Sequence, residues 1–179
     1  MSNQSVNGPS GKAGKNSSDI GSKTRHDLVK LLSGFLRKAD AHITFEEAVK
    51  DIPSGYFGRK ADGLPYSLWQ EVEHIRITQK DILEFCRDAH YQSPPWPEGY
   101  WPSEPAPLQD TAWKESIEGI MNDRKEFIRL LEDPAGDLFK PFPHGSGQNL
   151  VREAMLIVDH TSYHVGQIMI IRRLLGIYK

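Results

Sequence analysis

Large apolar side chains recur at three- and four-residue intervals along most of the sequence, and strict alternation of apolar and polar residues is nowhere sustained. The first spacing places apolar residues on one face of a helix, whereas a half-buried strand requires alternation. The pattern therefore predicts an all-α chain in which strands are rare or absent. With 179 residues, the chain is long enough for one well-buried domain and short for two.

Local start and stop signals divide this pattern into helices. The sequences Thr44-x-x-Glu47 and Ser67-x-x-Gln70 can each form a capping box, in which a hydroxyl and a longer side chain satisfy the free N–H groups at a helix start. A further start is indicated near Thr24, and this first helix carries one apolar stripe, formed by Leu28, Leu31, Leu32, Phe35 and Ala39.

The expected elements are four long helices and one short one, without internal repeats. The short helix runs from Thr44 toward Pro53, and the long helices after the first cover about 67–89, 111–132 and 148–175. This order predicts an antiparallel four-helix bundle with one short extra helix. Between residues 90 and 107, "HYQSPPWPEGYWPSEPAP" contains too many prolines for a helix or a central strand. Its four Trp and Tyr residues favour an ordered loop packed over the body.

Residues 1–23 are mostly Ser, Gly, Asn and Lys, with too little apolar surface to offset the entropy of ordering them. We therefore expect a flexible tail over 1–23 and one domain over 24–179. The tail lacks the apolar core of a signal peptide, and no apolar run approaches the roughly 20 residues needed to span a bilayer. A soluble, unexported protein is expected.

Charge and cysteine content narrow the classes of partner. The formal net charge is -2 and the pI is about 6.4, without a basic block that could follow a phosphate backbone, so no nucleic-acid partner and no membrane partner are expected. Cys86 is the only cysteine, which excludes an internal disulfide and a zinc site built from several thiolates. This usage fits a reducing compartment and predicts a cytoplasmic location.

Two histidines stand out on the last helix. At 100° per residue, His160 and His164 share a narrow arc with four apolar residues, Ile157, Ile168, Ile171 and Leu175, and therefore face the core. Two imidazoles at i and i+4 can converge on one metal ion. The alternative is two buried histidines that hydrogen-bond to backbone or to neighbours such as Thr161.

A third ligand has one strong candidate, His74 on the helix that starts at Ser67, at the edge of its apolar arc. Three imidazoles from two facing helices would leave coordination positions open, as in a working metal centre. A surface histidine is the alternative for this position. The remaining histidines lie at helix starts or in loops and are assigned no ligand role: His26, His42, His90 and His144.

The strings "LPYSLWQEVEHIRITQKDILEF" and "DHTSYHVGQIMIIRRLLG" resemble the DinB-like superfamily, small four-helix proteins that hold a divalent metal with three histidines. The resemblance covers about residues 24–178 and implies His74, His160 and His164 as the metal ligands. The "WPEGYWP" loop is similar to one found in a subset of these proteins, and relatives often have His where this chain has Tyr66.

The resemblance also suggests what such a site does. Relatives include metal-dependent hydrolases, and thiol transferases or isomerases that use a low-molecular-weight thiol. The resemblance therefore implies a small-molecule substrate and a divalent metal, Zn²⁺ or Ni²⁺. It also implies a homodimer and, if the chain resembles the thiol-using relatives, a thiol cofactor. Asp159 and Gln167 are candidates for groups beside the metal or in the pocket. No catalytic residue is assigned, because a helix-borne protease motif needs Glu where Thr161 stands. The competing hypothesis is a non-catalytic metal-binding or stress-associated helical protein.

Overall fold

The structure is a computed structural model that describes residues 13–109 and 111–178. Over these residues it contains only helices and no strand, which confirms the predicted all-α class for this part of the chain. The α-helices are α1 (Ala13–Arg37), α2 (Phe45–Val49), α3 (Leu68–Arg87), α4 (Ala112–Glu132) and α5 (Leu150–Leu174), with short 3-10 turns at Ser54–Tyr56 and Glu98–Tyr100. None of the helices in the described ranges is long and apolar enough to cross a membrane.

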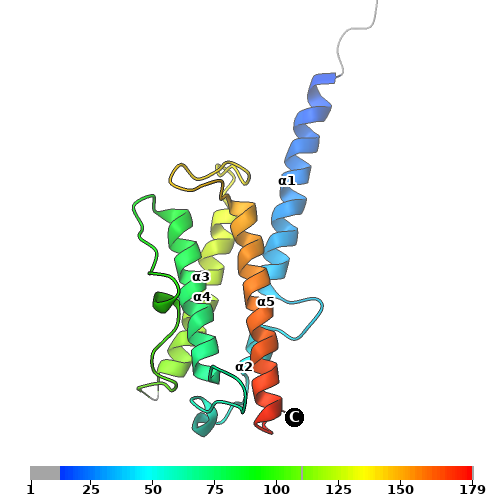
Figure 1. Ribbon diagram of the computed structural model, residues 1–179. Coiled ribbons are helices and arrows are strands. Elements are labelled where there is room, and N and C mark those ends of the chain that lie inside the picture. The colour runs from blue at the N-terminus through cyan, green and yellow to red at the C-terminus, as the bar shows by residue number, and fades with distance from the viewer. Residues whose placement is uncertain (1–12, 110, 179) are drawn as a thin grey trace, which may run out of the picture.

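The long helices α3, α4 and α5 pack side by side, and the C-terminal part of α1 packs against them (Figure 1). The helix α3 contacts both α4 and α5, and α1 packs against the same two helices, α4 and α5. The short α2 lies against α5 at the end of the molecule that holds the C-terminus. The site described below uses the contact between α3 and α5.

Both predicted capping boxes form and fix where α2 and α3 begin. Thr44 accepts a hydrogen bond at its hydroxyl from the Glu47 N–H (3.2 Å), and the Glu47 carboxylate accepts one from the Thr44 N–H (2.8 Å). In the same way the Ser67 hydroxyl accepts a hydrogen bond from the Gln70 N–H, and the Gln70 side-chain carbonyl accepts one from the Ser67 N–H, each at 3.2 Å. The predicted bounds of α3 and α4 agree with the structure to within about two residues, a difference typical of helix ends. The capping box accounts for this agreement at the start of α3.

The prediction for the first helix was wrong in two respects. The helix α1 already begins at Ala13 and not near Thr24, and its first turns extend beyond the packed helices (Figure 1). Each residue added to an established helix gains a hydrogen bond, so the packed turns support an extension with little tertiary contact. The expected flexible tail otherwise falls on residues 1–12, which lie outside the described residues.

The buried face of α1 is also rotated from the predicted stripe. Leu31 and Phe35 are 56% and 41% exposed, whereas the core side is formed by Val29, Leu32 and Leu36. Both sets have helical spacing, and the direction from which α4 and α5 approach decides between them. Phe35 instead lines a pocket beside α5.

The core consists of two apolar clusters, one toward each end of the packed helices. Toward the C-terminal end of α5, Val165, Ile168 and Met169 join α2 and the first half of α3; toward its start, Leu150, Ala154 and Ile157 join α1 and the ends of α3 and α4. The residues of α5 between the two clusters include His160 and His164, so the histidine pair lies near the middle of the packed helices.

The proline- and aromatic-rich segment between α3 and α4 is hydrogen-bonded to the side of α3. Ser67 and Gln70, the capping pair of α3, donate to the backbone carbonyls of Pro105 and Pro102, and the Tyr100 hydroxyl donates to Asp81 Oδ2 at 2.8 Å. The segment therefore has a defined course along α3, close to His74.

The core assignment predicts a matched pair of stability changes. Phe127 is fully buried, so Phe127→Ala should lower the free energy of unfolding by about 3–5 kcal/mol through lost apolar burial and a cavity. Phe139 is 63% exposed, so Phe139→Ala should change it by no more than about 0.5 kcal/mol. Urea denaturation of the two variants measures both values, and similar losses in the two would contradict the assigned packing.

Candidate metal centre

The three predicted histidines meet between α3 and α5. One ring nitrogen from each of His74, His160 and His164 lies within 4.8 Å of the others. His74 Nε2 and His160 Nε2 are 3.0 Å apart. His74 and His164 are 3% and 5% exposed, and His160 is half-buried. The structure thus brings together all the ligands that the sequence suggested.

Helix geometry explains this convergence. His160 and His164 are one turn apart and belong to the arc of α5 that also carries the buried Ile157 and Ile168. His74 follows the capped start of α3, where Val72 and Ile75 are fully buried beside it. Since both helices are packed through these apolar neighbours, the imidazoles are held on facing surfaces.

Hydrogen bonds to the Nδ1 atoms define which nitrogen of two rings is free. His74 Nδ1–H donates to the backbone carbonyl of Tyr100 (2.8 Å), and His164 Nδ1–H donates to the carboxylate of Glu71 (2.6 Å). A carbonyl and a carboxylate only accept, so Nδ1 carries the proton and Nε2 keeps its lone pair. Metal-binding histidines are oriented by contacts of this kind.

Burial keeps two of the imidazoles neutral. It lowers the pKa of His74 to about 4, against the opposing effect of its hydrogen bond to Tyr100, and it lowers the pKa of His160 to about 3, with a further contribution from the neighbouring histidines. Neutral imidazole is the form that binds metal ions. His74 and His160 are therefore neutral at pH 7, the charge state in which imidazole binds a cation.

These donors fit a divalent metal ion. A tetrahedral Zn²⁺ with Zn–N distances of 2.0–2.1 Å separates its nitrogen ligands by about 3.3 Å. In this site His74 Nε2 and His160 Nε2 are 3.0 Å apart, and the three candidate ligand atoms all lie within 4.8 Å of one another. No described residue forms a hydrogen bond with His164 Nε2, which leaves that nitrogen available.

An aromatic stack covers His74. Trp101 lies parallel to the His74 ring, with centroids 3.8 Å apart and an angle of 2°, and Tyr66 stacks on the other face of Trp101 at 3.7 Å. Tyr66 is thus connected to the His74 ring through Trp101. The stack fixes the plane of the imidazole and shields one of its faces from water.

A pocket of about 260 Å³ is lined by one of the three histidines, His164. Its lining includes His164 and Glu71, together with Trp101, Tyr163 and Gln167. The expectation for Gln167 as a pocket group therefore agrees with its position. Asp159 is exposed and is not among the residues that line this pocket, so the structure gives it no contact there.

The sequence analysis missed the groups that orient the ligands. Glu71 lies three residues before His74 on the same face of α3, and a carboxylate at that spacing from a core histidine was the available signal. The Tyr100 carbonyl and the Trp101 ring come from the segment after α3. No sequence pattern predicts which backbone carbonyl will accept a hydrogen bond from a ring nitrogen. Elsewhere, His144 bonds to the Phe85 carbonyl.

The sequence model of the DinB superfamily matches residues 23–168. The chain belongs to the DinB superfamily. No curated protein matches this DinB-superfamily chain, and no solved structure does so either. The match includes both helices that supply the three histidines, so family membership and the geometry of the centre concern the same part of the chain.

Removing the charge of Glu71 should weaken metal binding. Glu71→Gln keeps an acceptor oxygen for His164 but loses the carboxylate that makes the imidazole a stronger donor, so we expect about 10- to 100-fold lower affinity for Zn²⁺. Competition with a chromophoric chelator measures this. Glu115→Gln, at an exposed position of α4, is the control and should bind as the wild type does; equal affinity in all three proteins would contradict the role of Glu71.

The lowered histidine pKa values predict acid sensitivity of the metal-free protein. In the unfolded chain these imidazoles titrate near 6.5, whereas folding lowers the pKa of His74 to about 4 and that of His160 to about 3. Between these values the unfolded state binds more protons, so the free energy of unfolding should fall as pH decreases from about 6.5 to 4.

Denaturant titrations at pH 7 and pH 5 test this dependence. The loss of stability should be smaller in His160→Gln than in the wild type, and unchanged in His26→Gln, which alters an exposed histidine. A wild-type loss that persists in full in His160→Gln would assign the acid sensitivity to other groups.

Proposed function

We propose that this chain is an antiparallel four-helix bundle enzyme that uses one divalent metal ion, held by His74, His160 and His164, to act on a small molecule. The pocket beside the histidines carries this proposal, because His164 and its partner Glu71 form part of the wall of a space of about 260 Å³. A small molecule in this space would lie next to the ion. A catalytic site needs such an open position, whereas a structural site is closed by a fourth protein ligand.

The donor set supports this reading of the site. Among the described residues, the group of possible ligands consists of three histidines and no carboxylate or thiolate. Three neutral imidazoles would leave the full charge of the ion in place, and such an ion acidifies bound water or holds a thiol as thiolate. We therefore propose hydrolysis of a small substrate or transfer of a low-molecular-weight thiol. Zn²⁺ and Ni²⁺ are the metals we propose, since both bind imidazole well.

The residues around the ion have separate tasks in this proposal. Glu71 accepts the His164 Nδ1–H and so directs Nε2 toward the metal. Trp101 covers His74 and keeps water from that side. Gln167, which lines the pocket, offers an amide donor and acceptor to orient a polar group of the substrate.

The second candidate is a non-catalytic metal-binding protein in which the ion only stabilises the packed helices. The deep burial of His74 and His164 favours it, because an ion that bridges α3 and α5 would strengthen their contact. Metal removal would then lower stability without affecting any reaction.

The predicted homodimer and the cytoplasmic location are not tested by the fold and stay predictions.

Elemental mass spectrometry on protein purified without a metal-affinity tag tests the site first. We expect about one divalent ion per chain in the wild type and loss of that ion in His164→Ala. Leu174→Ala, at a position that is 61% exposed on α5, is the control and should retain the metal. An absence of metal in the wild type, even after reconstitution with Zn²⁺ and Ni²⁺, would refute the proposal.

Activity assays then separate the candidates. Saturable binding of a low-molecular-weight thiol to the metal-loaded protein would identify a thiol transferase, and turnover of ester or amide substrates without a thiol would identify a hydrolase. If the bound metal raises the melting temperature while both assays stay negative across broad substrate panels, the non-catalytic reading is favoured.

A further inference from the structure

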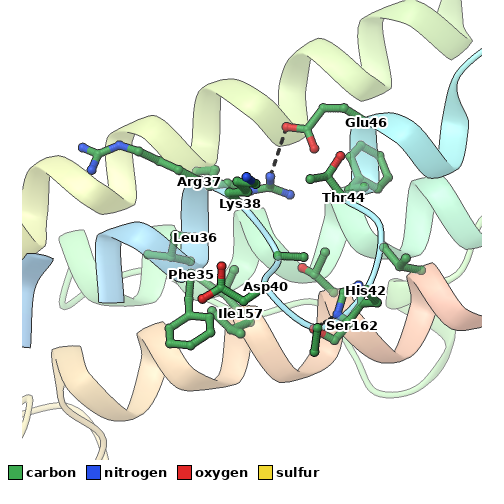
Figure 2. A pocket seen from close by; sticks show the side chains of 17 residues that line it. Phe35, Leu36, Arg37, Lys38, Asp40, His42, Thr44, Glu46, Ile157 and Ser162 are labelled. Atoms are coloured by element: carbon green, nitrogen blue, oxygen red, sulfur yellow. Dashed lines mark hydrogen bonds and ion pairs between the residues drawn. The ribbon is translucent and has the colours of Figure 1, made fainter. Parts of the chain in front are cut away.

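A second pocket lies on another face of α5, between the C-terminal end of α1 and the connection that leads to α2 (Figure 2). This α1–α5 pocket has a volume of about 300 Å³, within the usual range for small-molecule sites. None of the three histidines of the metal centre lines it, although Thr161 and Val165 of α5 do. The α1–α5 pocket is therefore separate from the metal centre but shares a helix with it.

A buried cation with few partners lies in its wall. Arg124 of α4 is only 7% exposed, and its contact with a charged group in the described residues is one Nη1–Oε1 distance of 3.4 Å to Glu46. A guanidinium has five N–H donors, so most of them lack a protein acceptor there. Burial lowers the pKa of Arg124, and the charge of Glu46 opposes this effect. The direction of the shift indicates that Glu46 only partly compensates the loss of hydration of the guanidinium. An anion in the pocket would supply the missing acceptors.

Unpaired acceptors lie around the same space. Glu46 Oε2 is buried and has no hydrogen-bond partner among the described residues. Asp40 lines the pocket at an exposed position and forms no ion pair within the part of the chain that the structure describes. Figure 2 shows Asp40, Lys38 and Glu46 around this space. These carboxylates would be satisfied by a cationic donor and would repel a simple anion.

The other lining residues indicate what kind of side chain a ligand of this pocket would carry. The apolar wall is formed by Phe35, Leu36, Phe45, Ile157 and Val165. His42 donates through Nδ1 to the Ile43 carbonyl (2.7 Å), so its Nε2 accepts from the Ser162 hydroxyl at 3.0 Å and ties the 38–44 connection to α5. The pocket thus combines an apolar surface with charges of both signs.

We propose that the α1–α5 pocket binds a small zwitterion with an aliphatic side chain, of the amino acid type. In this proposal the ligand carboxylate forms an ion pair with Arg124, and the ligand ammonium group forms ion pairs with Glu46 and Asp40. The ligand then lies antiparallel to the Arg124–Glu46 pair, so that positive and negative groups alternate. Three cationic side chains, Arg37, Lys38 and Arg124, and two anionic ones, Asp40 and Glu46, line the pocket. Because Arg37 forms an ion pair at 2.8 Å with Glu132, which lies outside the lining, two charges of each sign remain, and a neutral zwitterion keeps this balance. The aliphatic group packs on the apolar wall.

Isothermal titration calorimetry on the full-length, metal-loaded protein tests the proposal with L-leucine and two partial analogues. The analogue 4-methylpentanoate lacks the ammonium group, and isopentylamine lacks the carboxylate. We expect saturable binding of leucine and at least 10-fold weaker binding of each analogue. Absence of leucine binding, equal binding of 4-methylpentanoate, or tighter binding of inorganic phosphate would overturn it.

Variants assign the binding to this pocket. Arg124→Met should weaken leucine binding at least 10-fold, and unchanged affinity in the folded variant would refute the assignment. Should this buried substitution unfold the protein, Asp40→Asn provides the test at an exposed position, with several-fold weaker binding expected and Asp62→Asn as the exposed control. Wild-type affinity in Asp40→Asn would overturn the role given to that carboxylate. Repetition with metal-free protein should leave leucine binding unchanged, so the result does not depend on the metal centre.

Discussion

Three imidazoles lie at the centre of the contact between α3 and α5, which apolar side chains such as Val72, Ile75 and Ile168 hold together. A buried polar group destabilises the fold unless it finds a partner, so these rings restrict everything packed around them. Glu71 satisfies His164, and the Tyr100 carbonyl satisfies His74. The remaining ring nitrogens lie close together, with His74 Nε2 and His160 Nε2 at hydrogen-bond distance (3.0 Å), and a divalent cation is a partner that all three rings can share.

The long segment between α3 and α4 has a structural purpose that its composition only partly reveals. Prolines exclude helix and strand, and hydrogen bonds to α3 then give the segment a defined course. That course brings the Tyr100 carbonyl to His74 and lays Trp101 over the same ring. The segment therefore orients and shields His74, and its Trp101 also contributes to the wall of the neighbouring pocket.

Helix α5 serves two pockets of different chemistry. One is bordered by His164 and by aromatic side chains, and the other combines an apolar wall with Arg124 and carboxylates. Thr161 and Val165 of the second pocket alternate in sequence with His160 and His164 of the metal centre.

The sequence by itself determined the elements, because their signals are local. Apolar spacing defined the helices, capping residues fixed the starts of α2 and α3, and the arc of α5 placed His160 and His164 on the inner side. His74 could be proposed as the third ligand from its place on a facing helix. The three rings lie together in the structure, within the part of the chain that the DinB-superfamily model matches.

Only the tertiary structure decided what depends on contacts between distant residues. The buried side of α1 was set by the approach of its neighbours, which left Phe35 for the α1–α5 pocket in place of the core. Glu71, the Tyr100 carbonyl and Trp101 became partners of the histidines because packing brought separate segments together. Periodicity reports which face of a helix is apolar, but it carries no information on what will lie opposite that face.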